Sequence, residues 1–316
     1  MRGASHERPS RRSCLRPVTV GVLCAALAVL AAPTTRSMAA ASQAGTWPLR
    51  GKTVLITGST DGLGREVAIR AGALGAHVLV HGRNAERGAA VVDRIVKDGR
   101  GSATFHAADF ASLEAVRAFA QAIGRDHPRI DVLVNNAGVL VRDRQVSRDG
   151  HELHFAVNYL AGFLLTRTLV PSLVAAAPSR IINVASGSQS PIDFGDVMLE
   201  RPGAASRGYG QSKLAQILFT MDLADELRDR GVIVTALHPA TMMDTTMVRE
   251  AGMAARSSVD EGADAVMHLM VGTDVTTGTY YNGLRPSRAH AQAYDEAARQ
   301  RLRELSLQLT APAGPR

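Results

Sequence analysis

The sequence predicts an α/β fold of the doubly wound type, in which a seven-stranded parallel sheet is flanked by helices. Strand-like apolar runs alternate with helical patterns between residues 53 and 281, and a glycine-rich turn joins the first predicted strand to the first helix. The two longest connections follow the fifth and sixth predicted strands. Strands that alternate with helices require right-handed crossovers and a parallel sheet covered on both faces. We find no linker, repeat or low-complexity tract within residues 50–285, so a single domain is expected.

The elements follow one another at the short spacing that such a fold requires. The predicted strands are 53–57, 76–80, 103–106, 130–134, 180–184, 232–237 and 279–281. The clearest helical patterns are 65–75, 85–97, 113–124, 151–176 and 211–230. A final amphipathic helix is expected over 288–307, where apolar side chains recur on one face.

The turn between the first strand and the first helix has the glycine spacing of a nucleotide-binding loop. Glycines in such a turn allow a tight bend, a close approach of a pyrophosphate, and packing of the helix on the strand. The helix N-terminus then presents free N–H groups to the phosphates. The residues predicted to bind nucleotide here are Gly58, Ser59, Thr60, Asp61, Gly62, Leu63 and Gly64. Asp61 is unusual beside phosphates, and it is expected to point towards solvent.

The end of the second predicted strand indicates which nucleotide is bound. No acid stands there to hold a ribose 2′-hydroxyl, and Arg83-Asn84 follows the strand. A guanidinium can bind a 2′-phosphate through charge-assisted hydrogen bonds. These residues predict NADP in preference to NAD, unless Arg83 is merely a solvated surface residue. Asp109, next to Phe110, follows the third strand, where its carboxylate could accept from the adenine amino group.

Tyr209 and Lys213 form the strongest candidate for a catalytic pair. Residues four apart share one face of a helix, so the phenol and the ammonium can point to the same place. A nearby cation is expected to lower the pKa of Tyr209 from about 10, which would make the phenol a usable general acid and base. Ser186 follows the fifth strand, where its hydroxyl can bind a substrate carbonyl. The spacing of the pair alone is common by chance.

These motifs together resemble those of the single-domain short-chain dehydrogenase/reductase family, which has a Rossmann fold. The resemblance covers about residues 50–310. It rests on the ordered set Thr57-Gly-x-x-x-Gly-x-Gly64, Asn135-Asn-Ala-Gly138, Asn158, Ser186 and Tyr209-x-x-x-Lys213. The stretches 152–158, 163–166 and 302–306 look most like the retinol-dehydrogenase-like branch of that family.

The resemblance implies a role for each matching residue. Tyr209 would move the proton, Lys213 would tune it and bind the nicotinamide ribose, and Ser186 would orient the carbonyl. Asn158 would hold a water molecule for a proton relay, unless it only bends its helix. The segment Asn135, Asn136, Ala137 and Gly138 would line the adenosine side. Pro239 and Thr241 would contact the nicotinamide carboxamide, although Ala240 stands where the family usually has glycine.

Apolar residues in the two long connections favour a lipophilic substrate. The connection 187–208 carries Ile192, Phe194, Val197, Met198 and Leu199, and the connection 241–260 carries Met242, Met243, Met247, Val248 and Met253. Long loops at the carboxyl ends of parallel strands usually hold substrate. Methionine-rich surfaces adapt to ligands of variable shape. The alternative is that these side chains only pack the loops against the core.

The first 41 residues differ from the rest and are typical of an export signal. Arginines precede an apolar run, Val18 to Ala32, and small residues follow. The stretch 10–16 resembles a twin-arginine signal. The sequence therefore predicts an exported protein with a mature domain over 42–316. An uncleaved leader would make a membrane anchor, and a start site placed too early would leave a cytoplasmic protein.

Composition excludes several other classes of site. The chain has 36 basic and 29 acidic residues, of which the first 41 residues hold six arginines and one glutamate. The remainder carries 30 basic and 28 acidic residues, so no basic surface predicts nucleic-acid binding. Both cysteines, Cys14 and Cys24, lie in the leader, which excludes a cysteine nucleophile in the mature domain. No metal-ligand pattern is present.

The sequence thus predicts an NADP-dependent alcohol dehydrogenase or carbonyl reductase that acts on a small lipophilic molecule. The alternative is a non-catalytic NADP-binding sensor or regulatory protein, which would not need the Ser186, Tyr209 and Lys213 set. A sugar-nucleotide epimerase would need a larger C-terminal substrate domain. The resemblance also implies a homodimer through the helices at 151–176 and 211–230.

Overall fold

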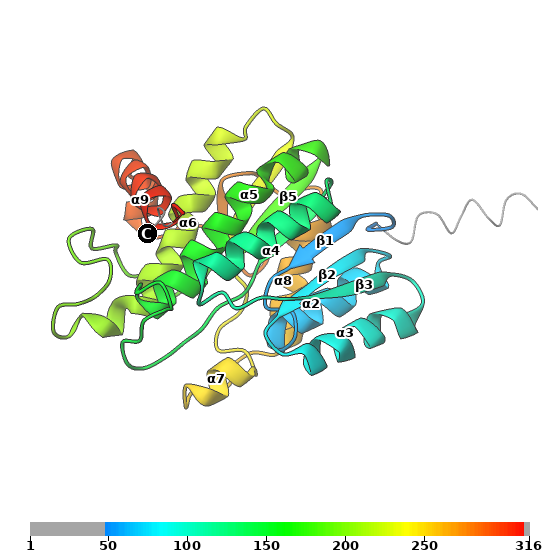
Figure 1. Ribbon diagram of the computed structural model, residues 1–316, viewed down its shortest axis with the longest axis horizontal. Coiled ribbons are helices and arrows are strands. Elements are labelled where there is room, and N and C mark those ends of the chain that lie inside the picture. The colour runs from blue at the N-terminus through cyan, green and yellow to red at the C-terminus, as the bar shows by residue number, and fades with distance from the viewer. Residues whose placement is uncertain (1–47, 313–316) are drawn as a thin grey trace, which may run out of the picture. The chain divides into compact units, whose positions relative to one another are not determined.

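The computed structural model describes residues 48–312 and contains one mixed sheet (Figure 1). Its strand order is β3-β2-β1-β4-β5-β6-β7-β8. The strands are β1 (Thr53–Ile56), β2 (His77–Gly82), β3 (Ser102–Ala107), β4 (Val132–Asn135), β5 (Ser179–Val184), β6 (Val232–His238), β7 (Thr279–Asn282) and β8 (Arg285–Ser287). The seven predicted strands, 53–57 through 279–281, all form and pair in parallel with one another.

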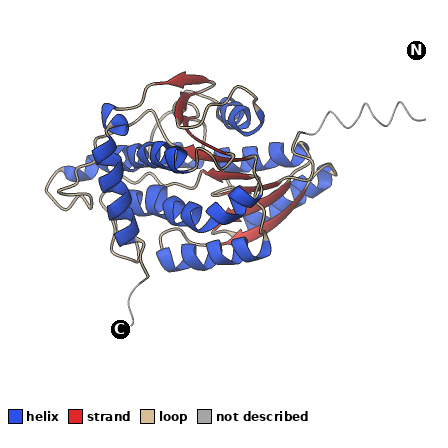
Figure 2. Ribbon diagram, turned by 90° about the horizontal axis from the view of Figure 1, so that it is seen from above, coloured by secondary structure: helices blue, strands red, loops and turns tan. Residues whose placement is uncertain are grey.

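Helices cover both faces of the sheet, as Figure 2 shows. The long helices are α2 (Gly62–Ala73), α3 (Ala85–Asp98), α4 (Leu113–Asp126), α5 (Ala161–Ala175), α6 (Gly208–Glu226), α8 (Val259–Val271) and α9 (Glu296–Leu309). Strand residues alternate between two apolar cores: Leu55 and Leu79 pack with α4, α5 and α6, whereas Val54 and Val78 pack with α2, α3 and α8. This alternation follows from the two-residue period of a strand, and it confirms the predicted fold class.

The sheet has one strand more than predicted, and that strand is antiparallel. β8 pairs with β7 through Tyr280–Ser287, Tyr281–Pro286 and Asn282–Arg285. It is three residues long and exposed throughout, so it has no apolar alternation from which it could be predicted. A proline is tolerated because the strand lies at the sheet edge.

Three helical predictions need correction. The prediction of a continuous final helix over 288–307 is wrong, because a short 3₁₀ turn (η3, Ala291–Tyr294) precedes α9 and Asp295 caps its N-terminus. The connection predicted over 241–260 contains a short helix, α7 (Thr246–Glu250). The helix α8, whose small and apolar residues cover β5 and β6, was not predicted from the sequence.

The helix predicted over 151–176 begins with a π-helical segment. This segment, η1 (Phe155–Leu160), is fully buried and leads directly into α5. The wider π-helical turn is common at functional sites, and Asn158 lies within it. The span 155–175 is long and apolar enough to cross a membrane, but most of it is buried in the domain, as is typical of a core helix.

The final helix α9 packs against α6 in this chain (Figure 1). The hydroxyls of Tyr159 and Ser306 lie 2.7 Å apart, and both are buried. Arg303 lies 3.3 Å from Asp222 of α6. This chain therefore covers part of a helix that was expected in a dimer interface, and a homodimer stays a prediction. The predicted export signal lies outside the described residues.

Candidate active site

The candidate site lies where β1 and β4 leave the sheet side by side. β1 pairs with β2 on one side and with β4 on the other, so the order of the strands reverses between them. In open α/β sheets, ligands bind outside the carboxyl ends of the strands at this reversal. The glycine turn follows β1, and the Asn135–Gly138 segment follows β4.

The glycine turn fits closely against the segment that follows β4. Gly58 has a φ of +64°, and a β-carbon there would lie 2.8 Å from Cα of Ala137. A β-carbon at Gly64 would overlap the carbonyl oxygen of Gly58 and the side-chain amide of Asn136. The bare backbone thus leaves the N-terminus of α2 open to an approaching pyrophosphate. This arrangement fits a dinucleotide.

Inward-facing side chains hold the turn in place. Oγ of Ser59 donates to the carbonyl oxygen of Ile56 at 2.7 Å and accepts from the amide of His81 at 2.9 Å. Nδ1 of His81 accepts from the amide of Gly58 at 3.1 Å. Burial lowers the pKa of His81 to about 4, so the imidazole stays neutral and keeps this acceptor. Ser59 was predicted as a nucleotide ligand, but its side chain faces the protein.

Asp61 does not simply point to solvent. Its Oδ1 accepts from the amide of Gly62 at 2.8 Å, which caps α2, and its Oδ2 lies 3.3 Å from Arg87. Burial would raise the pKa of this carboxyl, but hydrogen bonds from Thr246 and Gly62 outweigh it, so the pKa lies below its usual value. The acid therefore ties the glycine turn to α3 and to α7.

The predicted 2′-phosphate reader is an exposed side chain held only by a long ion pair. The side chain of Arg83 is 70 % exposed, and its guanidinium lies 3.9 Å from Asp109, which is too long for a hydrogen bond. Asn84 instead caps α3, because its Oδ1 accepts from the amide of Arg87 at 2.8 Å. Phe110 is buried against the imidazole of His81, with ring centroids 4.2 Å apart.

The segment Asn135–Gly138 braces the fold at its start and lies beside the catalytic lysine at its end. Nδ2 of Asn135 is buried and donates to Thr166 and Asn183, so it braces the sheet. Nδ2 of Asn136 donates to the carbonyls of Thr57 and Gly58, and the amide of Ala137 donates to Oγ1 of Thr57 at 3.0 Å. A β-carbon at Gly138 would lie 3.7 Å from Nζ of Lys213. Only the Gly138 end therefore reaches the catalytic side.

Tyr209, Lys213 and Ser186 converge as predicted from their places in the chain. Tyr209 and Lys213 lie one turn apart near the start of α6, with Nζ of Lys213 5.7 Å from the Tyr209 ring centroid. The side chain of Ser186 lies close enough to the phenol of Tyr209 to lower its pKa through hydrogen bonding. The carbonyl of Ser186 accepts from the hydroxyl of Tyr280 at 3.0 Å, which fixes the end of β5.

The charges in this group differ from the expectation. Desolvation raises the pKa of Tyr209, and the hydrogen bond with Ser186 offsets this only in part. Burial lowers the pKa of Lys213 to about 7. Nζ of Lys213 donates to the carbonyl of Val184 at 2.8 Å and to Oε1 of Gln216 at 3.0 Å. The predicted lowering of the tyrosine pKa is therefore not seen, because both groups lose solvation.

The side chain of Asn158 braces the backbone at Val139, just after Gly138. Its Oδ1 accepts from the amide of Val139 at 2.7 Å, and its Nδ2 donates to the carbonyl of Val139 and to Ser212. Both the oxygen and the nitrogen of the Asn158 side-chain amide are therefore hydrogen-bonded within the protein. The water-holding role implied by the family stays a prediction.

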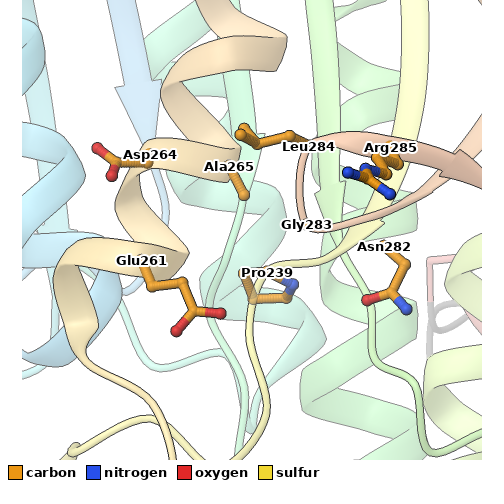
Figure 3. A pocket seen from close by; sticks show the side chains of 8 residues that line it. All are labelled: Pro239, Glu261, Asp264, Ala265, Asn282, Gly283, Leu284 and Arg285. Carbon is orange, nitrogen blue, oxygen red and sulfur yellow. The ribbon is translucent and has the colours of Figure 1, made fainter.

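Pro239 and Thr241 follow β6, at the same edge of the sheet. Oγ1 of Thr241 lies 3.0 Å from Nε2 of His238. Pro239 also lines a hollow of about 280 Å³ between α8 and the β7–β8 turn, shown in Figure 3. The other residues around it are Glu261, Asp264, Ala265, Asn282, Gly283, Leu284 and Arg285. None of them belongs to the predicted catalytic set, so this hollow is separate from the group around Tyr209.

The two long connections differ in how their apolar residues are used. In the first, Ile192, Val197 and Leu199 are buried in the core and pack the loop, whereas Phe194 and Met198 are half-buried. In the second, only Val248 of the predicted residues is buried, and Met242, Met243, Met247 and Met253 are half-buried. The methionines of the second connection therefore keep surface for a ligand.

Several residues that support the site were not predicted from the sequence. They are His81, Gln216, Tyr280, Glu152 and His154. Gln216 lies three positions after Lys213, a spacing that puts the two on one helix face. The others reach the site only through the fold. Within residues 48–312, no group of three or more His, Cys, Asp or Glu side chains is arranged to hold a metal ion.

Known proteins with similar sequences are short-chain dehydrogenases. The family described as short chain dehydrogenase matches residues 52–255. Human retinol dehydrogenase 13 is 33 % identical over 290 residues, which cover 84 % of this chain and 86 % of that protein. Human retinol dehydrogenase 11 is 32 % identical over 297 residues, covering 90 % and 93 %.

Solved structures agree with these relatives. An uncharacterized protein from Mycobacterium paratuberculosis has a TM-score of 0.71 at 26 % identity, covering 84 % of this chain and 96 % of that one. A metagenomic short-chain oxidoreductase in complex with NADP has a TM-score of 0.59 at 28 % identity, covering 76 % and 100 %. The chain belongs to the short-chain dehydrogenase/reductase family, in its retinol-dehydrogenase-like branch, and is an NAD(P)-dependent oxidoreductase.

Proposed function

We propose that this protein transfers a hydride between NADP and the carbonyl or alcohol carbon of a small lipophilic molecule, with Tyr209 as general acid and base. The observation that carries the proposal is the meeting of Tyr209, Ser186 and Lys213 at the carboxyl edge of the sheet. A non-catalytic NADP sensor would not require this group. When bound, the nicotinamide supplies or accepts the hydride.

The residues of the chain divide the remaining work. The hydroxyls of Ser186 and Tyr209 bind the reacting oxygen from one side. Tyr209 retains its proton because desolvation raises its pKa, and a protonated phenol is the form that can donate to a reduced carbonyl. Lys213 would bind the nicotinamide ribose and, when protonated, supplies positive charge beside the phenol. Gly138, which has no side chain, leaves room at Lys213.

Two features support NADP and a lipophilic substrate. No acid ends β2, and the exposed Arg83 can turn towards a 2′-phosphate. The half-buried methionines after β6 offer an adaptable apolar surface. The relatives are named as retinol dehydrogenases, and retinol is a lipophilic alcohol.

Direct titration with NADPH and with NADH tests the cofactor. We expect tight binding of NADPH and weaker binding of NADH. Arg83→Gln should weaken NADPH binding by about tenfold to a hundredfold, the value of a charge-assisted hydrogen bond, and leave NADH binding unchanged. Arg94→Gln, on the exposed side of α3, is the control. Equal loss for both nucleotides would contradict a phosphate-reading Arg83.

A panel of aliphatic and aromatic aldehydes with NADPH tests the reaction. Tyr209→Phe should lower turnover by about 10²-fold to 10⁴-fold, the usual worth of a general acid, and keep NADPH affinity. A Tyr209→Phe protein as active as the wild type would exclude this mechanism. Tight NADPH binding with no turnover on any substrate would favour the sensor.

We also propose that residues 1–41 direct export through a twin-arginine route, which carries folded proteins. Replacement of Arg11 and Arg12 by lysine should retain the protein in the cytoplasm, as measured by cell fractionation. Unchanged distribution of the variant would contradict this route.

A further inference from the structure

A buried acid–imidazole pair lies immediately before η1 and does not belong to the catalytic group. Glu152 and His154 are 1 % and 3 % exposed. Oε1 of Glu152 lies 2.8 Å from Nδ1 of His154, and the carboxylate also accepts from the amides of His154 and Phe155. Burial would raise the pKa of Glu152, but these hydrogen bonds outweigh it and hold the pKa below its usual value. The carboxylate is therefore charged, and both of its oxygens accept hydrogen bonds.

The hydrogen bonds determine which nitrogen of His154 carries the proton. A carboxylate only accepts, so Nδ1 of His154 must donate to it. The amide of Val141 donates to Nε2 of His154 at 3.1 Å, so Nε2 has no proton. Glu152 thus fixes the His154 tautomer whose Nε2 accepts from Val141. In many functional histidines, a carboxylate bonded to one ring nitrogen sets the tautomer in the same way.

The pair contacts two parts of the candidate site. The His154 ring lies edge-on to the Tyr209 ring, with centroids 6.1 Å apart and an interplanar angle of 83°. A β-carbon at Gly208, the residue before Tyr209, would lie 2.8 Å from Nδ1 of His154. The start of α6 therefore rests directly on the pair.

The same region holds the backbone segment Val139–Val141, here called the wall, at two points. Asn158 binds the amide and the carbonyl of Val139, and His154 binds the amide of Val141. Beyond this segment, Arg142 reaches the carbonyl of Ala251 after α7, and Nε of Arg144 donates to the carbonyl of Met198 at 2.9 Å. The stretch from Val139 to Arg144 thus joins both long connections.

We propose that His154 is a positioning residue, whose Glu152-fixed tautomer holds the Val139–Val141 wall at a set distance from Tyr209. The substrate carbonyl would reach Tyr209 between this wall and the start of α6. The inference rests on the proposed role of Tyr209. Its distinctive consequence is that a change of tautomer, without loss of a side chain, displaces the wall.

Glu152→Gln weakens the preference for one tautomer with little change of shape. Its side-chain amide has one acceptor oxygen, so it cannot accept from Nδ1 of His154 and from the amides of both His154 and Phe155 as the two carboxylate oxygens do. Where its NH2 group faces Nδ1, it donates to that nitrogen and the imidazole proton moves to Nε2. That proton then faces the amide proton of Val141, and the two donors repel. His154→Gln is the conservative counterpart, because its amide can donate to Glu152 and accept from Val141. His154→Leu can do neither, and His151→Gln, whose side chain has no contact with the site, is the control.

Nitrogen NMR of ¹⁵N-histidine-labelled protein and hydrogen exchange at the Val141 amide test whether Glu152 fixes the His154 tautomer. Neither measurement requires turnover. We expect a protonated Nδ1 in wild type, an increased share of protonated Nε2 in Glu152→Gln, and faster exchange at Val141 in Glu152→Gln and His154→Leu. A wild-type His154 protonated on Nε2, or exchange at Val141 unchanged in both variants, would overturn the proposal. These readouts hold even if the proposed reaction fails.

Kinetics with NADPH and decanal test whether the position of the Val139–Val141 wall affects the reaction at Tyr209. Displacement of the wall by about 1 Å can cost about 10²-fold in rate. We expect kcat to fall by about tenfold to a hundredfold in Glu152→Gln and His154→Leu, while the Kd for NADPH changes less than about twofold, with His154→Gln close to wild type. Equal loss in His154→Gln and His154→Leu would show a packing role only and overturn the assignment. Absence of wild-type turnover on decanal and the aldehyde panel would reject the proposed reaction, and with it the positioning role, while the NMR result would separately decide the tautomer.

Discussion

The nucleotide half of the site, around the glycine turn and Arg83, differs in its chemical groups from the catalytic half, around Tyr209 and Lys213. The nucleotide half uses bare backbone at the glycine turn and an arginine whose side chain is 70 % exposed. The catalytic half uses buried polar side chains: Asn158 is 1 % exposed and Lys213 is 4 % exposed. Added volume should therefore damage the first half, whereas changes of charge should damage the second. In the catalytic half, activity and stability oppose each other, because a buried cation is costly to keep.

The largest effect should follow from Lys213→Met. Loss of the ammonium should reduce turnover by about 10²-fold or more. The same variant should be more stable than wild type near pH 7, because it removes a desolvated charge. Lys97→Met, at an exposed position of α3, is the control. A variant both inactive and less stable would show that the hydrogen bonds of Lys213 outweigh its desolvation.

The stability gain should depend on pH in a defined direction. The pKa of Lys213 falls from 10.5 in the unfolded chain to about 7 in the folded protein. Between these values the unfolded chain binds one more proton, so the stability contribution of Lys213 rises with pH by up to about 1.4 kcal/mol per unit. Below about pH 7 the penalty is full and constant. Urea unfolding of wild type and Lys213→Met from pH 6 to pH 9.5 measures this, and parallel curves would contradict it.

Gly64→Ala should produce the next largest effect, and through volume alone. The added methyl would overlap the carbonyl of Gly58 and the Asn136 amide. We expect a loss of about 1–3 kcal/mol in unfolding free energy, as for other overpacked sites, and loss of measurable NADPH binding. Gly124→Ala, also in a helix but with room for a methyl, should instead be neutral or stabilising. Similar behaviour of the two variants would contradict the close fit.

Gln216→Leu should shift the pH dependence rather than abolish activity. It removes an acceptor 3.0 Å from the Lys213 ammonium, which should lower the pKa of Lys213 further below about 7. We expect the corresponding inflection of kcat/KM to move to lower pH by about one unit. Gln216→Glu should move it to higher pH. Shifts in the same direction in both variants would contradict this role.

Tyr159→Phe should have the smallest effect and lies outside both halves. It removes one buried hydrogen bond to Ser306, which still donates to the carbonyl of Leu302. We expect a loss of about 1 kcal/mol in unfolding free energy, with kcat/KM unchanged. Reduced activity would show that α9 influences the site.

The sequence predicted the glycine turn and the central strands more fully than the short elements β8 and α7. Gly58 and Gly64 are specified by local spacing, because the turn needs them where they stand. The central strands were predictable because each is a short apolar run between turn signals. β8 and α7 were not, since each is short and stabilised by its neighbours rather than by its own pattern.

In the catalytic half, local spacing predicted the catalytic groups but not their environment. Tyr209 and Lys213 are related by one helical turn, so their approach follows from the sequence. Glu152 and Val141 are brought to His154 by the turn of the chain before η1, and Tyr280 reaches Ser186 across the sheet. The direction of the Tyr209 pKa shift depends on burial, which no local pattern reports.

The position of α9 at the end of the described chain has a consequence during synthesis. Every residue that α9 covers on α6 and η1 leaves the ribosome before α9 does. The buried rings of Tyr159 and Phe219 lie on these two elements, and the growing chain must keep this surface from other apolar chains until α9 emerges. Apolar surface exposed at this stage is prone to aggregation. The apolar surface on α6 and η1 therefore stays prone to aggregation until α9 has been synthesised and has packed against it.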